Sequence, residues 1–191
     1  MMSIDKISNK SDLIEYLNQG QPVKYLFFWG HQPKLDGSIG KGCLSQWWSE
    51  RFTVDDLEYF SAEHYIMAEK ARLFADSDAL EKILSAKHPG AAKQFGRAVR
   101  GFNEQVWREH RFDIVVRANL GKFGQNARLQ EYLLTTGKRV LVEASPRDKI
   151  WGIGLTEDNP AASNPLQWKG ENLLGFALME VREQLKEAAR S

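Results

Sequence analysis

The chain has 191 residues, enough to bury a sizeable core in one domain and too few for two domains of usual size. Its 42% hydrophobic and 27% charged residues are typical of a globular protein. The net charge of +1 excludes nonspecific binding of nucleic acid or anionic membranes through the overall charge of the protein. The single cysteine, Cys43, excludes an internal disulfide and a cysteine-based zinc cluster. The N-terminus lacks the apolar run of a signal peptide or membrane span, so we expect a cytoplasmic protein that binds no membrane.

The predicted elements are mostly helices with a few short strands between them. In chain order we expect a helix over 5–20, a strand over 24–29, and over 52–59 either a hairpin or a strand and turn leading into Ser61. Helices should follow over 61–74, from 76 or 77 to before 88, and over 91–99, 103–120 and 129–134. The chain should end with a strand over 139–144, a loop over 145–170 and a final helix with one apolar face. Because strands and helices do not alternate regularly, we predict an α+β fold, mainly helical with a small sheet, rather than a doubly wound fold.

The helix that begins after Ser61 carries the sharpest chemical pattern. Helical spacing places Glu63 and Lys70 on the same side as the apolar Ile66. Charges that face a protein interior must be paired or must line a pocket, because burying them alone costs several kcal/mol. The pattern therefore indicates either a structural ion pair or a functional pocket. His64, one step round the helix, is more typical of a packing or hydrogen-bonding residue than of a catalyst.

Two further segments are candidates for ligand contacts. The strand over 139–144 leads into a loop with an acid, a base, a tryptophan and two glycines, and such loops often hold functional side chains but also occur without a role. The final helix begins near Asn172, where free N–H groups and the helix dipole could hold a phosphate unless the helix is capped by its own chain. Lys93, Arg97 and Arg100 form a basic face by i, i+4 and i+7 spacing, which is either solvated or binds an anion.

Several classes of site are not supported by the sequence. It contains no HExxH, CxxC, GxxxxGK[ST], GxGxxG or GxSxG motif and no acidic cluster that demands a metal ion, so we expect neither a metal nor another cofactor. The six tryptophans suit either core packing or stacking against a flat heterocycle.

Taken in order, the motifs resemble those of the NADAR, or YbiA-like, N-glycosidase family. They are Ser61–Tyr65 with Lys70 and Ala71, Gly96 and Arg97, Trp107, Lys122 and Phe123, Leu133–Gly137, Leu141–Ala144, Asp148–Gly154 and Trp168–Gly175. Their ordered combination is specific, although each motif alone is weak. The resemblance implies a NADAR/YbiA-like domain over 41–191, with residues 1–40 as a variable N-terminal segment of the same domain.

The resemblance also implies hydrolysis of an N-ribosyl bond. One implied substrate group is the phosphoribosylamino-pyrimidine intermediates of riboflavin biosynthesis, with release of ribose 5-phosphate. The other is ADP-ribose attached to guanine, so that the partner is a small phosphoribosyl or ADP-ribosyl molecule or an ADP-ribosylated nucleic acid. An alternative of another class is a sensor that binds ADP-ribose or a related nucleotide without cleaving it.

The family's essential glutamate corresponds to Glu63. Its tryptophan corresponds to Trp107, and its Asp-x-x-Trp-Gly segment contains Asp148 and Trp151. The implied catalytic residues are Glu63, Asp148 and Lys70, and the implied substrate-binding residues are Trp107, Trp151, Arg97, Lys122, Glu143, Gly152 and Asn172. We expect Glu63 to stabilise the cationic sugar and to activate water or attack directly, and Asp148 to bind sugar hydroxyls or handle the leaving group's proton. A rival mechanism makes Lys70 an amine nucleophile that opens the ribose through a Schiff base, which requires a lowered pKa.

Overall fold

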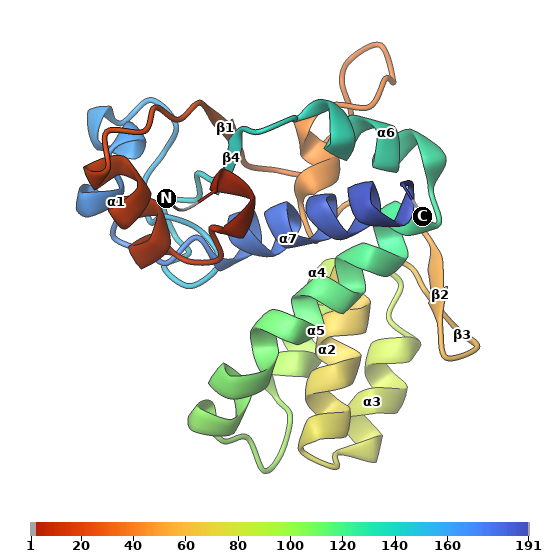
Figure 1. Cartoon of the computed structure of the whole chain (residues 1–191). Coiled ribbons are helices and arrows are strands. Elements are labelled where there is room, and N and C mark those ends of the chain that lie inside the picture. The colour runs from red at the N-terminus through yellow and green to blue at the C-terminus, as the bar shows by residue number, and fades with distance from the viewer. Residues whose placement is uncertain (1–2, 191) are drawn as a thin grey trace. The chain divides into compact units, whose positions relative to one another are not determined.

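The computed structural model describes residues 3–190 and is mainly helical (Figure 1). The helices are α1 (Lys10–Asn18), α2 (Ala62–Leu73), α3 (Ser77–Leu84), α4 (Pro89–Arg97), α5 (Glu104–Gly124), α6 (Ala127–Thr135) and α7 (Leu173–Ala188). The strands are β1 (Tyr25–Phe28), β2 (Phe52–Val54), β3 (Leu57–Tyr59) and β4 (Val140–Glu143), and short 3-10 helices are η1 (Ile4–Lys6), η2 (Lys41–Leu44), η3 (Pro160–Ser163) and η4 (Pro165–Gln167). The predicted α+β class is confirmed. None of the helices within 3–190 combines the length and the apolarity needed to cross a membrane.

The chain folds as two compact units. The first consists of the residues up to Leu44 together with those from Glu131 onward, and the second is Ser45–Gln130. The segment 1–40, expected to be a variable part of the domain, contributes β1 to the first unit.

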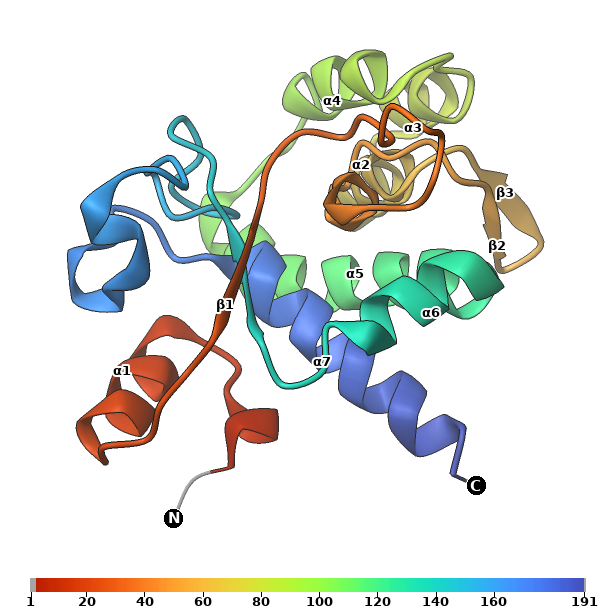
Figure 2. The same ribbon diagram turned by 90° about the horizontal axis from the view of Figure 1, so that it is seen from above.

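The first unit is built on the parallel pair of β1 and β4. The register runs from Tyr25 opposite Val140 to Phe28 opposite Glu143. Helix α7, the long blue helix of Figure 2, packs against β4. The predicted apolar face of this helix is confirmed, because its members are buried: Leu174, Leu178, Val181 and Leu185. The buried strand and helix fix the loop that connects them.

The second unit is arranged around α2, which packs against α3, α4 and α5. Ser61 caps α2 as predicted, and the close approach of α4 depends on Gly96, because a Cβ at this position would overlap Met67 Sδ. The predicted hairpin is also present, and Asp55 and Asp56 turn it with φ angles of 51° and 61°.

Helix α4 differs from its predicted range of 91–99. It begins at Pro89, which suits the first turn of a helix, and His88 Nδ1 accepts a hydrogen bond from the backbone N–H of Ala91 at 3.1 Å. It ends at Arg97, so Arg100 lies beyond the helix and does not belong to a three-residue helical face.

Candidate active site

Glu63 is a buried carboxylate in the first turn of α2. Glu63 as a whole residue is only 4% exposed. Its backbone N–H donates a hydrogen bond to the Gln46 carbonyl at 3.0 Å. The N-terminal end of a helix favours negative charge, because the unpaired N–H groups there carry a partial positive charge. The helix that follows Ser61 therefore places an acidic group inside the second unit, as its spacing predicted.

His64 has a structural role, as its spacing also suggested. The ring is 1% exposed, Nε2 lies 3.1 Å from the Ala86 carbonyl, and Nδ1 lies 2.7 Å from Ser61 Oγ. These contacts fit a neutral ring in which Nε2–H donates to Ala86 and Nδ1 accepts from Ser61. Burial is the main cause that lowers the His64 pKa; the Ala86 hydrogen bond opposes this effect, and the charge of His88 adds to it.

The lowered His64 pKa predicts acid sensitivity. Well above pH 6.5 the ring is neutral in both states, but as the pH falls through this value the unfolded chain takes up a proton that the folded ring resists, so the free energy of unfolding falls. Between pH 7.5 and 5.5 we expect wild type to lose up to about 1 kcal/mol more stability than His64→Gln. Urea unfolding at both pH values measures this difference, and parallel losses in the two proteins would contradict it.

Lys70 is half-buried among aromatic rings and is not part of an ion pair. Its Nζ lies 4.3 Å from the centre of the Phe102 ring and 5.6 Å from that of Trp107. Among the ion pairs of residues 3–190, none includes Lys70, so the structural ion pair with Glu63 considered from the sequence is not formed. Burial lowers the pKa of Lys70; Glu104 opposes this effect, Arg97 adds to it, and Glu63 opposes it.

The predicted basic face is divided between different environments. Arg97 is exposed at the end of α4, whereas Lys93 lies with its Nζ 5.7 Å from the centre of the Trp47 ring. Arg100 donates to Asp76 Oδ1 at 2.8 Å, and hydrogen bonds from Arg100 hold the pKa of Asp76 well below its usual range. Among residues 3–190, no carboxylate forms an ion pair with the exposed Arg97, which stays a candidate for phosphate binding.

Lys122 is fully buried in α5. Its ammonium donates to the Ser45 carbonyl at 2.8 Å and lies 4.8 Å from the centre of the Phe123 ring. A buried ammonium group requires such acceptors, because desolvation disfavours its charge. Lys122 therefore anchors the segment that begins at Ser45.

The Asp-x-x-Trp-Gly segment in the first unit is folded around the carboxylate of Asp148. Asp148 Oδ1 accepts from the N–H groups of Ile150 at 2.9 Å and Trp151 at 2.8 Å. Gly152 must lack a side chain, because a Cβ there would lie 2.9 Å from the Glu143 carbonyl. Asp148 and Gly152 thus shape the loop that presents the half-buried Trp151.

Asn172 ties the start of α7 to β4. Its side chain accepts from Glu143 N–H at 2.9 Å and donates to the Leu141 carbonyl at 2.9 Å. The backbone N–H groups at the helix start donate to carbonyls of the 149–152 loop, in the bonds Glu171 to Lys149, Asn172 to Gly152, Leu173 to Ile150 and Leu174 to Trp151. Of the two interpretations that the sequence left open here, a phosphate site or a helix start capped by its own chain, these hydrogen bonds favour the second.

The implied site residues thus form two groups. The second unit holds Glu63, Lys70, Arg97, Trp107 and Lys122, of which Lys70 contacts Trp107. The first unit holds Glu143, Asp148, Trp151, Gly152 and Asn172, which belong to one hydrogen-bonded network. Sequence reasoning missed Gln46, whose carbonyl binds Glu63 N–H, because no periodicity singles out a residue in an irregular segment.

A model of the NADAR domain matches residues 27–186 of this sequence. The chain belongs to the NADAR family. N-glycosidase R617 of Acanthamoeba polyphaga mimivirus is 43% identical to it over 166 residues, which cover 84% of this chain and 96% of that protein. N-glycosidase YbiA of Escherichia coli K12 is 33% identical over 132 residues, which cover 69% of this chain and 74% of that protein. Together these findings identify the chain as an N-glycosidase.

The NADAR fold is also confirmed by a solved structure. The NMR structure of the E. coli protein YbiA matches with a TM-score of 0.71 at 27% identity and covers 90% of each chain. The family match begins at residue 27, within the segment 1–40 that the motifs had left unassigned, and so includes part of β1.

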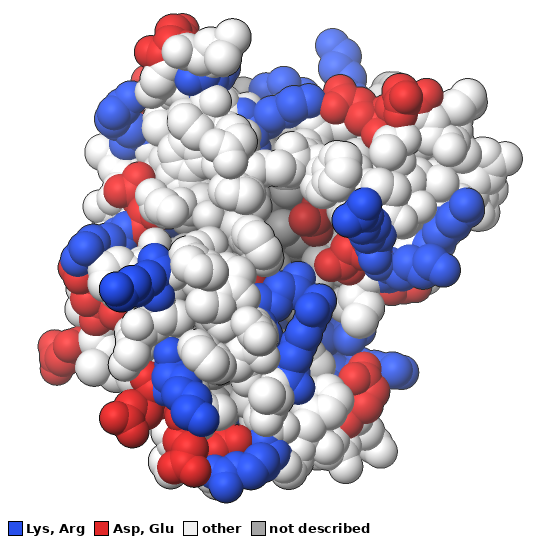
Figure 3. All heavy atoms as spheres, turned by 180° about the vertical axis from the view of Figure 1, so that it is seen from behind, with Lys and Arg blue, Asp and Glu red and all other residues white. Residues whose placement is uncertain are grey.

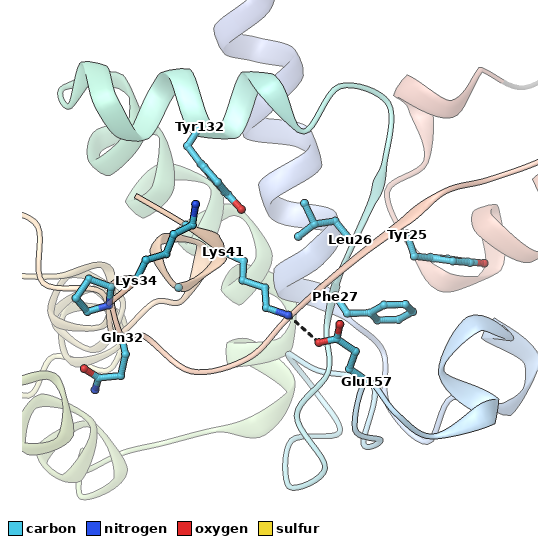
Figure 4. A pocket seen from close by; sticks show the side chains of 11 residues that line it. Tyr25, Leu26, Phe27, Gln32, Lys34, Lys41, Tyr132 and Glu157 are labelled. Atoms are coloured by element: carbon cyan, nitrogen blue, oxygen red, sulfur yellow. Dashed lines mark hydrogen bonds and ion pairs between the residues drawn. The ribbon is translucent and has the colours of Figure 1, made fainter. Parts of the chain in front are cut away.

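This NADAR chain also has a cavity of about 560 Å³ within its first unit, drawn in Figure 4. It is lined by β1, the start of η2, Tyr132 of α6 and Glu157, and Lys41 Nζ pairs with Glu157 at 2.8 Å. None of the implied site residues lines this cavity. Within residues 3–190, no group of three or more His, Cys, Asp and Glu side chains is placed to hold a metal ion.

Proposed function

We propose that this N-glycosidase hydrolyses the N-glycosidic bond of phosphoribosylamino-pyrimidine intermediates of riboflavin biosynthesis and releases ribose 5-phosphate. The observation that carries the proposal is the buried carboxylate of Glu63 at the start of α2. Cleavage of an N-ribosyl bond develops positive charge at C1′, and a carboxylate held away from bulk water stabilises this charge more strongly than an exposed one.

In the proposed reaction, the bond between C1′ and the base nitrogen breaks, and water supplies both the hydroxyl at C1′ and the proton that the base carries away. Glu63 stabilises the cationic sugar and activates the water. Trp107 is assigned to the base and Arg97 to the phosphate, both in the unit that holds Glu63. In the other unit, Asp148 and Trp151 stay candidates for substrate contacts, and Asp148 Oδ1 already accepts hydrogen bonds from its own loop.

The environment of Lys70 favours a covalent form of this reaction. Its lowered pKa increases the fraction of neutral amine, and it has no ion-pair partner in the part of the chain that is described. In this form the Lys70 amine bonds to C1′ as the base departs, the ribose ring opens to a Schiff base, and water then releases the sugar and restores the amine. Glu63 keeps its role in stabilising charge and activating water.

We expect borohydride to trap this Schiff base during turnover. Reduction would leave a stable ribosyl phosphate adduct on Lys70, which peptide mass spectrometry locates. Lys70→Arg keeps the charge but cannot form a Schiff base, so it should give no adduct and little turnover. Wild-type turnover without any adduct on Lys70 would assign the attack on C1′ to water alone.

The function is tested by comparing two substrates directly. Release of free ribose 5-phosphate from a phosphoribosylamino-pyrimidine is measured beside release of ADP-ribose from ADP-ribosylated guanine DNA. On the face drawn in Figure 3, basic side chains are interspersed with acidic ones, as the net charge of +1 suggests. We expect turnover of the small substrate. Faster cleavage of the DNA would reassign the substrate, and binding without any release would indicate a sensor.

A further inference from the structure

Two buried polar atoms in the segment 45–48 have no hydrogen-bond partner among the described residues. They are Gln46 Oε1, an acceptor, and Trp48 Nε1, a donor, and both residues are only 8% exposed. Native proteins satisfy nearly all buried polar atoms, because an unmade hydrogen bond costs free energy. An unmatched acceptor and an unmatched donor within three residues therefore point to a ligand that supplies both partners.

The main chain of the same segment is firmly held. The Ser45 carbonyl accepts from Lys122 Nζ at 2.8 Å and from Trp48 N–H at 3.2 Å, and the Gln46 carbonyl accepts from Glu63 N–H at 3.0 Å. The segment is thus fixed to α5 and to the turn of α2 that carries the proposed catalytic carboxylate. These anchoring bonds use backbone carbonyls and leave the Gln46 Oε1 and Trp48 Nε1 groups unused.

We propose that Gln46 and Trp48 form a substrate-binding element of this N-glycosidase, an inference that rests on the proposed function. The Gln46 side-chain carbonyl accepts a hydrogen bond from the substrate, and the Trp48 indole N–H donates one to it. Both are uncharged, so they suit a neutral group that offers a donor and an acceptor rather than a phosphate. The ribose hydroxyls and the N–H and C=O edge of the base both have this chemistry. Gln46 and Trp48 bind and position the substrate and do not take part in bond breaking.

The test separates binding from stability by comparing two glutamines of the same unit. Gln46→Leu removes the unpaired Oε1 at similar volume, so kcat/KM should fall about 10- to 100-fold while the melting temperature stays equal or rises. Gln125 is the matched control, because its amide is fully used by Thr53, accepting at 2.9 Å and donating at 2.7 Å. Gln125→Leu should lower the melting temperature and leave kcat/KM unchanged.

Substrate analogues identify the group that is bound. If Gln46 binds the ribose, Gln46→Leu should not lower kcat/KM for a 2′-deoxyribosyl substrate. If Gln46 binds the base, the substitution should not lower kcat/KM for a base analogue that lacks the N–H and C=O edge. An equal penalty with every analogue, or wild-type kcat/KM in Gln46→Leu, would overturn the assignment and leave Gln46 as the site of a structural water. Should Gln46→Leu fail to fold, Trp48→Phe removes the indole N–H and is judged by the same criteria. An inactive wild type would refute the proposed function instead.

Discussion

Replacing Glu63 by glutamine is expected to lower turnover by at least about 10²- to 10⁴-fold, the usual contribution of a general acid or base. Glutamine has nearly the same volume and keeps a polar oxygen, but it cannot hold the negative charge that we assign to stabilising the sugar cation. The backbone bond from residue 63 to the Gln46 carbonyl is unaffected by the substitution. We therefore expect the melting curve to stay nearly unchanged while kcat, measured by ribose 5-phosphate release, falls.

Glu69 provides a matched control on the same helix. Its carboxylate forms ion pairs with Arg72 and, at 3.3 Å, with Arg117, and it has no part in the proposed reaction. Glu69→Gln should lose at most a little stability and keep wild-type turnover, because partly exposed ion pairs contribute about 0–1 kcal/mol. Near-wild-type activity of Glu63→Gln would remove Glu63 from the mechanism, and equal losses in both variants would point to general damage to α2.

Replacing Gly175 by alanine is expected to destabilise the first unit by roughly 3 kcal/mol or more. A Cβ at this position would overlap the Leu141 carbonyl and approach the amide of Asn172, which itself holds β4 to the start of α7. Both obstacles are fixed by other bonds, so the strand and helix must separate. For a chain of this size, calorimetry should show the melting temperature falling by about 6–12 °C.

Gly90 is the matched control, because it also lies in the first turn of a helix. A Cβ there meets its nearest neighbour, His88 Nδ1, at 3.4 Å, which is ordinary contact. Alanine is the better helix former, so Gly90→Ala should be neutral or stabilising by up to about 1 kcal/mol. Similar losses in the two variants would show that the close approach of α7 to β4 does not govern the effect at Gly175.

Local chemistry in the sequence predicted most of the elements. The capping residue Ser61, the apolar face of α7 and the turn at Asp55 and Asp56 each act within a few residues, so their effects are visible in the printed chain. The start of α4 was predicted wrongly, because a proline can either end a helix or occupy its first turn. Helix α4 starts two residues earlier than expected because Pro89 occupies its first position and His88 caps it.

The residues of the candidate site stay predictions, and the structure adds the contacts that each of them makes. Motif order was enough to select Glu63, Lys70 and Asp148, and spacing was enough to expect a charged pair facing the interior. Whether that pair forms depends on which rings and carbonyls surround each group, and here Lys70 lies over Phe102 instead. Whether the N–H groups near Asn172 are free for a phosphate likewise depended on the loop at 149–152, whose carbonyls accept their hydrogen bonds.

The sequence alone predicted most of the helices and strands and the family resemblance, because caps, periodicity and ordered motifs are properties of neighbouring residues. Only the tertiary structure decided which buried groups have partners, since hydrogen bonds such as Lys122 to Ser45 join residues far apart in the chain. Burial sets the free-energy cost of a charge or an unpaired amide, and burial exists only after distant segments have packed together.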